Sequence, residues 1–215
     1  MSSAKYSVGE EIAHSVSHGI GAVLSAIGLG FLVWLSIQHG DIWYVVSSIV
    51  YGVSLILLYS ASTLYHAITN PRAKRIFQLL DHSMIFVLIA GTYTPFALVS
   101  LHGPWGWSLF AIAWGITIAG IMLETMKKER IKWLSLSLYL GLGWMAVIFI
   151  KPMIDSIPTI GLLFLLAGGL SYSFGVIFYV RKQMLYHHAI WHLFVMAGSA
   201  LHFCAVLFGV VLADV

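Results

Sequence analysis

Long apolar runs separated by short polar breaks are the dominant pattern along the chain. A helix needs about 20 apolar residues to cross the hydrocarbon core of a bilayer. Breaks that carry charges or proline divide this sequence into seven runs suited to that length. We expect spans near residues 17–37, 43–66, 77–100, 106–123, 133–151, 159–180 and 188–211. The pattern therefore predicts an all-α fold, a bundle of seven transmembrane helices.

The first run is expected to remain as an anchor and not to serve as a signal peptide. Glu10 and Glu11 precede it where a signal peptide would have a basic region, and six further runs follow it. The chain has no fixed-period repeat and no linker. Residues 1–215 are therefore expected to form a single membrane domain, with a short cytoplasmic segment, 1–16, before the first span.

Composition and charge agree with a membrane protein. Hydrophobic residues make up 60% of the chain and charged residues 9%, whereas about a quarter of the residues in soluble proteins are charged. The net charge of +3 comes from basic clusters between the apolar runs, which indicates topology signals and no nucleic-acid partner. Ten of the 11 Lys and Arg residues fall on one predicted side, so the N-terminus is expected in the cytoplasm and the C-terminus outside. The ten are Lys5, Arg72, Lys74, Arg75, Lys127, Lys128, Arg130, Lys132, Arg181 and Lys182, and the exception is Lys151.

Histidine is unusually frequent for such a chain. Ten histidines outnumber the 8 Asp and Glu residues, and the only cysteine is Cys204. One cysteine can form neither an intramolecular disulfide nor a cysteine-based zinc site. Any metal ion would therefore be bound by histidine and carboxylate ligands.

Five polar residues inside the predicted spans are brought together by helix geometry. Residues four apart share a helix face, so Ser62 pairs with His66, and His188 pairs with His192. Asp81 and His66 are equally distant from the middle of the loop that joins their helices, so they are expected at similar depth. Because ionisable groups within spans are costly in hydrocarbon, they mark a functional interior. All five are predicted to lie near the cytoplasmic surface.

Three imidazoles with one open position are typical of a catalytic zinc site. We predict His66, His188 and His192 as the ligands of Zn²⁺. Asp81 would coordinate the metal directly, accept a hydrogen bond from a bound water, or act as its general base, and Ser62 would orient that water or a substrate carbonyl. The alternative is that these side chains only form hydrogen bonds between helices, each contributing about 1 kcal/mol.

These residues resemble the metal-site signature of the progestin and adipoQ receptor superfamily, and in particular its bacterial hemolysin III branch. The likeness covers essentially the whole chain. It is carried by the sequences EEIAHSVSHGIG at 10–21, ASTLYH at 61–66, AGTYTP at 90–95 and HAIWHLF at 188–194. One departure is His14, which stands where members of the family often have Asn.

The resemblance implies a multi-pass protein of the bacterial cell membrane with seven helices and a zinc ion held by three histidines. It also implies kinship with alkaline ceramidases, zinc-dependent membrane amidases that use a similar set of Ser, Asp and three His. Haemolytic activity and a part in membrane-lipid homeostasis are attributed to members of the family. Membrane lipids are accordingly the expected substrates or ligands.

Other polar residues in and near the spans receive simpler interpretations. Glu11, His14 and His18 lie on one helical face, which could form a second metal or proton-handling site. The simpler expectation is that Glu11 and His18 are polar packing or gating residues of the first helix. His187 is expected at the surface, and His202 is expected to play a structural role. A kink is predicted around Pro95.

Three functions are compatible with the sequence. The first is a metal-dependent hydrolase of a lipid amide or ester. The second is a sensor or regulator of membrane lipid state, in which zinc is structural. The third, a pore-forming cytolysin, is disfavoured because a secreted pore former should be soluble before insertion, and this chain is apolar from its first helix onward.

Overall fold

Long helices build the structure, a computed structural model that describes residues 6–39, 41–126 and 131–213. Eight α-helices and four short 3₁₀ or π segments follow one another, and no strand occurs in the described ranges. The elements are α1 (Val8–Ser36), η1 (Ile37–His39), α2 (Ile42–Ala67), α3 (Pro71–Pro95), η2 (Phe96–Leu101), α4 (Gly103–Met126), α5 (Lys132–Gly143), η3 (Trp144–Val147), α6 (Ile150–Ser156), α7 (Thr159–Val180), α8 (His187–Val206) and η4 (Leu207–Val211).

Six of the predicted spans correspond to single helices that are long and apolar enough to cross a membrane. The remaining one, 133–151, is a broken element in which Lys132–Val147 and Ile150–Ser156 meet at a bend of 53°. With this pair counted as one span the total reaches seven. The all-α bundle is therefore confirmed, and the span predicted at 133–151 is divided by a bend.

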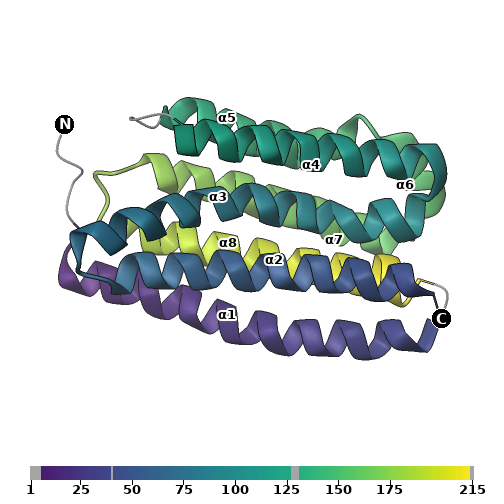
Figure 1. Cartoon of the computed structure of the whole chain (residues 1–215), viewed down its shortest axis with the longest axis horizontal. Coiled ribbons are helices and arrows are strands. Elements are labelled where there is room, and N and C mark those ends of the chain that lie inside the picture. Colours follow the sequence, from purple (N-terminus) through teal and green to yellow (C-terminus); the bar gives the residue numbers. More distant parts are fainter. Residues whose placement is uncertain (1–5, 40, 127–130, 214–215) are drawn as a thin grey trace.

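The helices lie roughly parallel to one another, and their connections alternate between the two ends of the bundle (Figure 1). The start of α1, the α2–α3 connection and the α7–α8 connection lie at one end, and η4 ends at the other. This agrees with the odd number of crossings. Which end faces the cytoplasm stays a prediction, and four of the basic residues on which it depends, Lys5, Lys127, Lys128 and Arg130, lie outside the described residues.

Two helices begin earlier than the hydropathy pattern predicted, because polar caps stabilise their first turns. The Ser7 hydroxyl accepts a hydrogen bond from the Glu10 backbone N–H, and the Glu10 carboxylate accepts one from the Ser7 backbone N–H. This capping box starts α1 at Val8. Asn70 caps α3 in a similar way, with Pro71 as the first helical residue. The longer α1 places Glu11, a predicted gating residue, inside a regular helix.

Pro95 ends α3, and the chain continues as the π segment η2. Proline has no N–H to give to the residue four positions earlier, here Gly91. The hydroxyls of Thr92 and Thr94 donate to the carbonyls of Leu88 and Ala90, and not to that of Gly91. At Pro95, where a kink was predicted, the backbone changes from α to π geometry. Gly91 itself lies so close to α2 that a Cβ atom would collide with Ser54.

The close contact at Gly91 predicts a loss of stability on substitution. Gly91→Ala should lower the free energy of unfolding by about 1–3 kcal/mol, because the new methyl group must displace a packed helix. Gly115→Ala is the matched control, since a Cβ at Gly115 meets no atom within 4 Å. Thermal unfolding of both variants in detergent, followed by tryptophan fluorescence, measures the difference. Equal midpoints for the two variants would contradict the close packing of α2 and α3.

Candidate metal centre

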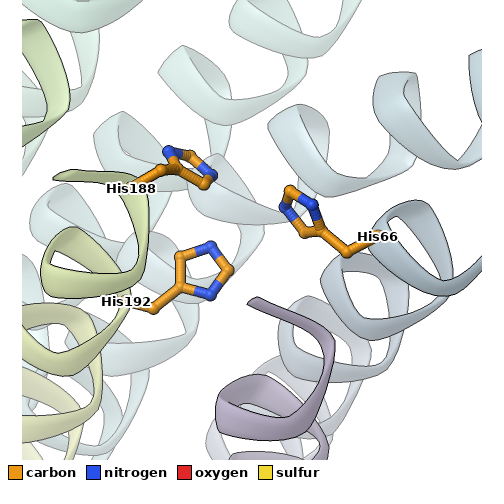
Figure 2. Close-up of side chains that lie close together, drawn as sticks. All are labelled: His66, His188 and His192. Carbon is orange, nitrogen blue, oxygen red and sulfur yellow. The ribbon is translucent and has the colours of Figure 1, made fainter. Parts of the chain in front are cut away.

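Three histidines from two helices face one another at the end of the bundle where α1 begins. His66 lies in the last turn of α2, and His188 and His192 lie one turn apart at the start of α8. One ring nitrogen from each lies within 4.8 Å of the other two. Figure 2 shows the ring of His66 opposite the two rings from α8, with all three directed toward a common space. The three predicted ligands are therefore brought together.

Burial and missing hydrogen bonds make these histidines suitable for a metal. His66 is 3% exposed and His192 is 1% exposed. His66 Nε2 and His188 Nδ1 are buried and have no hydrogen-bond partner among the described residues. A buried polar atom without a partner costs about 1–3 kcal/mol. A metal ion among the three rings would give the buried His66 Nε2 a partner, so the residues present fit such an ion.

Two contacts with α1 orient the ring of His192. Its Nδ1 atom lies 3.3 Å from the carbonyl oxygen of His14, and 3.2 Å from the hydroxyl of Ser17. Because a carbonyl oxygen only accepts hydrogen bonds, the first contact favours the tautomer with its proton on Nδ1. The lone pair is then on Nε2, the nitrogen that a metal would bind.

Helix α1 adds three polar side chains to the group. The Glu11 carboxylate accepts hydrogen bonds from His66 Nδ1 at 2.6 Å and from the Lys74 ammonium at 2.8 Å. The ring centroid of His14 lies 4.6 Å from that of His66, and the ring of His18 stacks on His192 at 3.5 Å. The structure therefore brings these three residues of α1 into contact with the histidines of α2 and α8. Glu11, His14 and His66 also form a second group whose ligand atoms lie within 4.8 Å of one another.

Asp81 and Ser62 occupy different places around the histidines. Ser62 is 1% exposed, lies one turn before His66, and its hydroxyl has no partner among the described residues. Asp81 belongs to neither group of close ligand atoms found in the described part of the chain. It lines a cavity of about 510 Å³ together with His188 and with Tyr65, the neighbour of His66. The structure thus places Asp81 in the wall of a cavity that reaches His188.

A layer of hydrogen-bonded phenols lies beneath the histidines. The Tyr59 hydroxyl donates to Ser199 Oγ at 2.7 Å, and the Tyr172 hydroxyl lies 2.7 Å from the same oxygen. The Tyr59 ring meets the edge of His18 at 4.9 Å. Tyr59 and Ser199 are both buried. This phenol layer joins α2, α7 and α8 on the side of the site that faces the middle of the bundle.

Sequence reasoning missed Tyr6, which covers the histidines from the chain end. Its ring stacks on His188 at 5.4 Å and meets the edge of His14 at 4.7 Å. Burial, and then the neighbouring tyrosines Tyr65 and Tyr179, raise the pKa of the Tyr6 hydroxyl well above its usual range. The phenol therefore stays protonated. No pattern in the sequence marked Tyr6, because it precedes the first apolar run.

Two further histidines, His187 and His202, contact helix α7. The expectation that His187 lies at the surface is wrong, because it is 5% exposed and its Nδ1 atom lies 3.1 Å from the Phe178 carbonyl. The cause is Tyr186, whose left-handed backbone (φ 56°) precedes α8 and turns His187 back onto α7. His202 has the structural role predicted for it, since its Nε2 atom lies 3.1 Å from the Leu165 carbonyl across the α7–α8 contact.

The fold and the site define a class of protein: a multi-pass helical membrane protein with a buried histidine centre near one end. The family model described as haemolysin-III related matches residues 6–203. The chain therefore belongs to the haemolysin-III-related family. Its bacterial relatives indicate that it resides in the plasma membrane.

Individual relatives agree with this assignment. The chain is 47% identical to Hemolysin-3 of Bacillus cereus over 201 residues, which are 94% of this chain and 92% of the relative. It is 45% identical to the Hemolysin-3 homolog of Bacillus subtilis (strain 168), with 94% and 95% of the two chains covered. The human monocyte to macrophage differentiation factor is 28% identical, over 92% of this chain and 83% of its own length.

The cover formed by Tyr6 predicts how easily reagents reach the histidines. Tyr6→Ala should make His188 react several-fold faster with diethylpyrocarbonate, because the ring that stacks on it is removed. Tyr6→Phe keeps the ring and should react like the wild type. Mass spectrometry of the modified peptide over time gives the rates. Equal rates for all three proteins would show that Tyr6 does not shield the site.

Proposed function

We propose that this protein is a zinc-binding membrane protein of the hemolysin III type that acts in membrane lipid homeostasis, as a metal-dependent hydrolase of a lipid amide or ester. The observation that carries the proposal is the convergence of His66, His188 and His192 on one space. His66 and His188 each have a buried nitrogen without a hydrogen-bond partner among the described residues. Three imidazoles are the ligand set of several catalytic zinc sites. When bound, the zinc ion would act as a Lewis acid that polarises a carbonyl and acidifies water.

The remaining chemistry is assigned to residues of the chain. Asp81 lines the cavity next to His188, where its carboxylate would accept a proton from an attacking water. Ser62 is buried one turn from His66 with an unpartnered hydroxyl, which would hold a substrate carbonyl by a hydrogen bond. The protonated Tyr6 hydroxyl lines the same cavity and would help to exclude bulk water.

The lining of the cavity suits an amphiphile. The cavity is lined by charged residues such as Arg75 and Lys182 and also by apolar residues such as Trp133 and Leu136. A lipid with its head group at the membrane interface would place polar atoms near the charged residues and its chains along the apolar ones. An amide or ester bond at the head of such a lipid would then lie near the histidines.

A second candidate function is a non-catalytic sensor of membrane lipid state with a structural zinc ion. The observation that favours it is His14, whose ring centroid lies 4.6, 4.8 and 5.2 Å from those of His66, His188 and His192. Both of its ring nitrogens are buried without partners among the described residues. A fourth imidazole would close the coordination sphere, and closed sites are structural.

Metal analysis of the purified protein tests the site that both functions need. The wild type should carry about one zinc ion per chain, as expected for a single site, and His188→Ala and His192→Ala should lose most of it. His202→Ala is the control, because His202 bonds to a helix carbonyl away from the site. Unchanged zinc content in the His188 and His192 variants would refute the ligand assignment.

Hydrolysis is tested separately from metal binding. Asp81→Asn should retain zinc and abolish the release of fatty acid from a panel of amide- and ester-linked lipids, because the amide cannot accept the proton. Glu124→Gln is the matched control, since Glu124 is a carboxylate that lines the same cavity. If the wild type releases no fatty acid while a cellular phenotype depends on His66, the sensor is correct.

A further inference from the structure

We infer that Glu11 of α1 is a positioning residue for the metal centre, which holds the ring of His66 in the tautomer and direction needed to bind the ion. The inference rests on the proposed metal site and adds a helix that the three predicted ligands do not include. It assigns to Glu11 a role other than the gating or packing expected from the sequence.

The Glu11 carboxylate is placed to accept a hydrogen bond from the ring of His66. Glu11 Oε2 lies 2.6 Å from His66 Nδ1, and a carboxylate oxygen accepts a hydrogen bond from an N–H. The proton of a neutral His66 ring is therefore on Nδ1, and its lone pair is on Nε2. That second nitrogen is buried and has no partner among the described residues. A carboxylate behind one nitrogen of a histidine commonly directs the other toward a metal and raises its basicity.

Glu11 is itself held in place by Lys74. The Lys74 ammonium, from the first turn of α3, lies 2.8 Å from Glu11 Oε1. The two oxygens of one carboxylate thus contact two different helices, α2 through His66 and α3 through Lys74. Lys74 also lies 5.2 Å from the centre of the Tyr65 ring. The cation favours the ionised carboxylate, which is the stronger acceptor for the His66 N–H.

The neighbouring glutamate, Glu10, makes different contacts from those of Glu11. Glu10 carries the same charge on the same turn, but its carboxylate caps α1 at Ser7 and accepts a hydrogen bond from the Tyr186 backbone N–H. Helix capping and the contact with the start of α8 are therefore performed by Glu10. The orientation of Glu11 toward His66 is a separate interaction, and Glu10 provides a control with matched chemistry.

Zinc affinity, measured by competition with a chelator on the full-length purified protein, tests the inference. Glu11→Ala should weaken zinc binding by about 10–100-fold, the usual effect of removing a partner of a metal ligand. Glu11→Gln should lose less, because its amide oxygen can still accept from Nδ1. Lys74→Met should lose less than Glu11→Ala, and Glu10→Gln should bind like the wild type.

A second measurement needs no metal and separates positioning from a general loss of structure. Nitrogen-15 NMR of histidine-labelled, zinc-free protein reports which ring nitrogen of His66 carries the proton, with the signal assigned by comparison with His66→Gln. The wild type should show the proton on Nδ1, and Glu11→Ala should show a mixture or the other tautomer. If Glu11 were only structural, Glu11→Ala would lower the unfolding temperature and leave the tautomer of His66 unchanged.

The outcomes keep the two proposals apart. If Glu11→Ala binds zinc as tightly as the wild type, or if His66 keeps its tautomer in that variant, the positioning role is wrong and the metal site stands. If the wild type binds no zinc, the metal site fails, and with it the role of Glu11 toward a metal. Weaker zinc binding together with a changed tautomer, at an unfolding temperature like that of Glu10→Gln, supports the inference.

Discussion

The burial of imidazole rings inside a helical bundle is the constraint on which the rest of this structure depends. In hydrocarbon there is no water to satisfy a polar group, so each ring nitrogen must find a partner within the protein. Five rings, those of His14, His18, His66, His188 and His192, are packed at one end of the bundle, and four of them have at least one buried nitrogen without a partner in the described chain. Such a cluster is costly for an empty core and favourable for a bound cation, which is why it carries the functional proposal.

The sequence was sufficient to predict the spans and the three-histidine group, because both follow from regular helix geometry. The spacing of His188 and His192 needs only the helical repeat, and His66 was grouped with them because the predicted topology puts all three near the same end of the bundle. The depth of Asp81 could be predicted, but its place in a cavity wall and the contact of Glu11 with His66 could not, since they depend on how far separate helices approach and rotate. His187 was misplaced for a related reason: the left-handed backbone of Tyr186 is a local feature that hydropathy does not encode.

Helix α1 has a larger part in the site than its apolar composition indicates. Its exposed face carries large apolar residues such as Ile12 and Val16, while Glu10, His14 and His18 are buried. One helix thus faces lipid on one side and the histidine centre on the other. The carboxylate of Glu11 joins α1 to α2 and α3 beside His66, so the arrangement of the histidines and the packing of these three helices depend on the same contacts.

The phenol layer lies beneath the histidines and bears on how a substrate would enter the site and how a product would leave it. Tyr59, Tyr172 and Ser199 are joined by short hydrogen bonds between three helices, and the cavity beside His188 lies on the other side of the rings, near the chain start. The phenol layer and this cavity thus lie on opposite sides of the histidine rings. Under the proposed hydrolysis, a released product and the next lipid would compete for this cavity, so product release would limit how fast the next lipid binds.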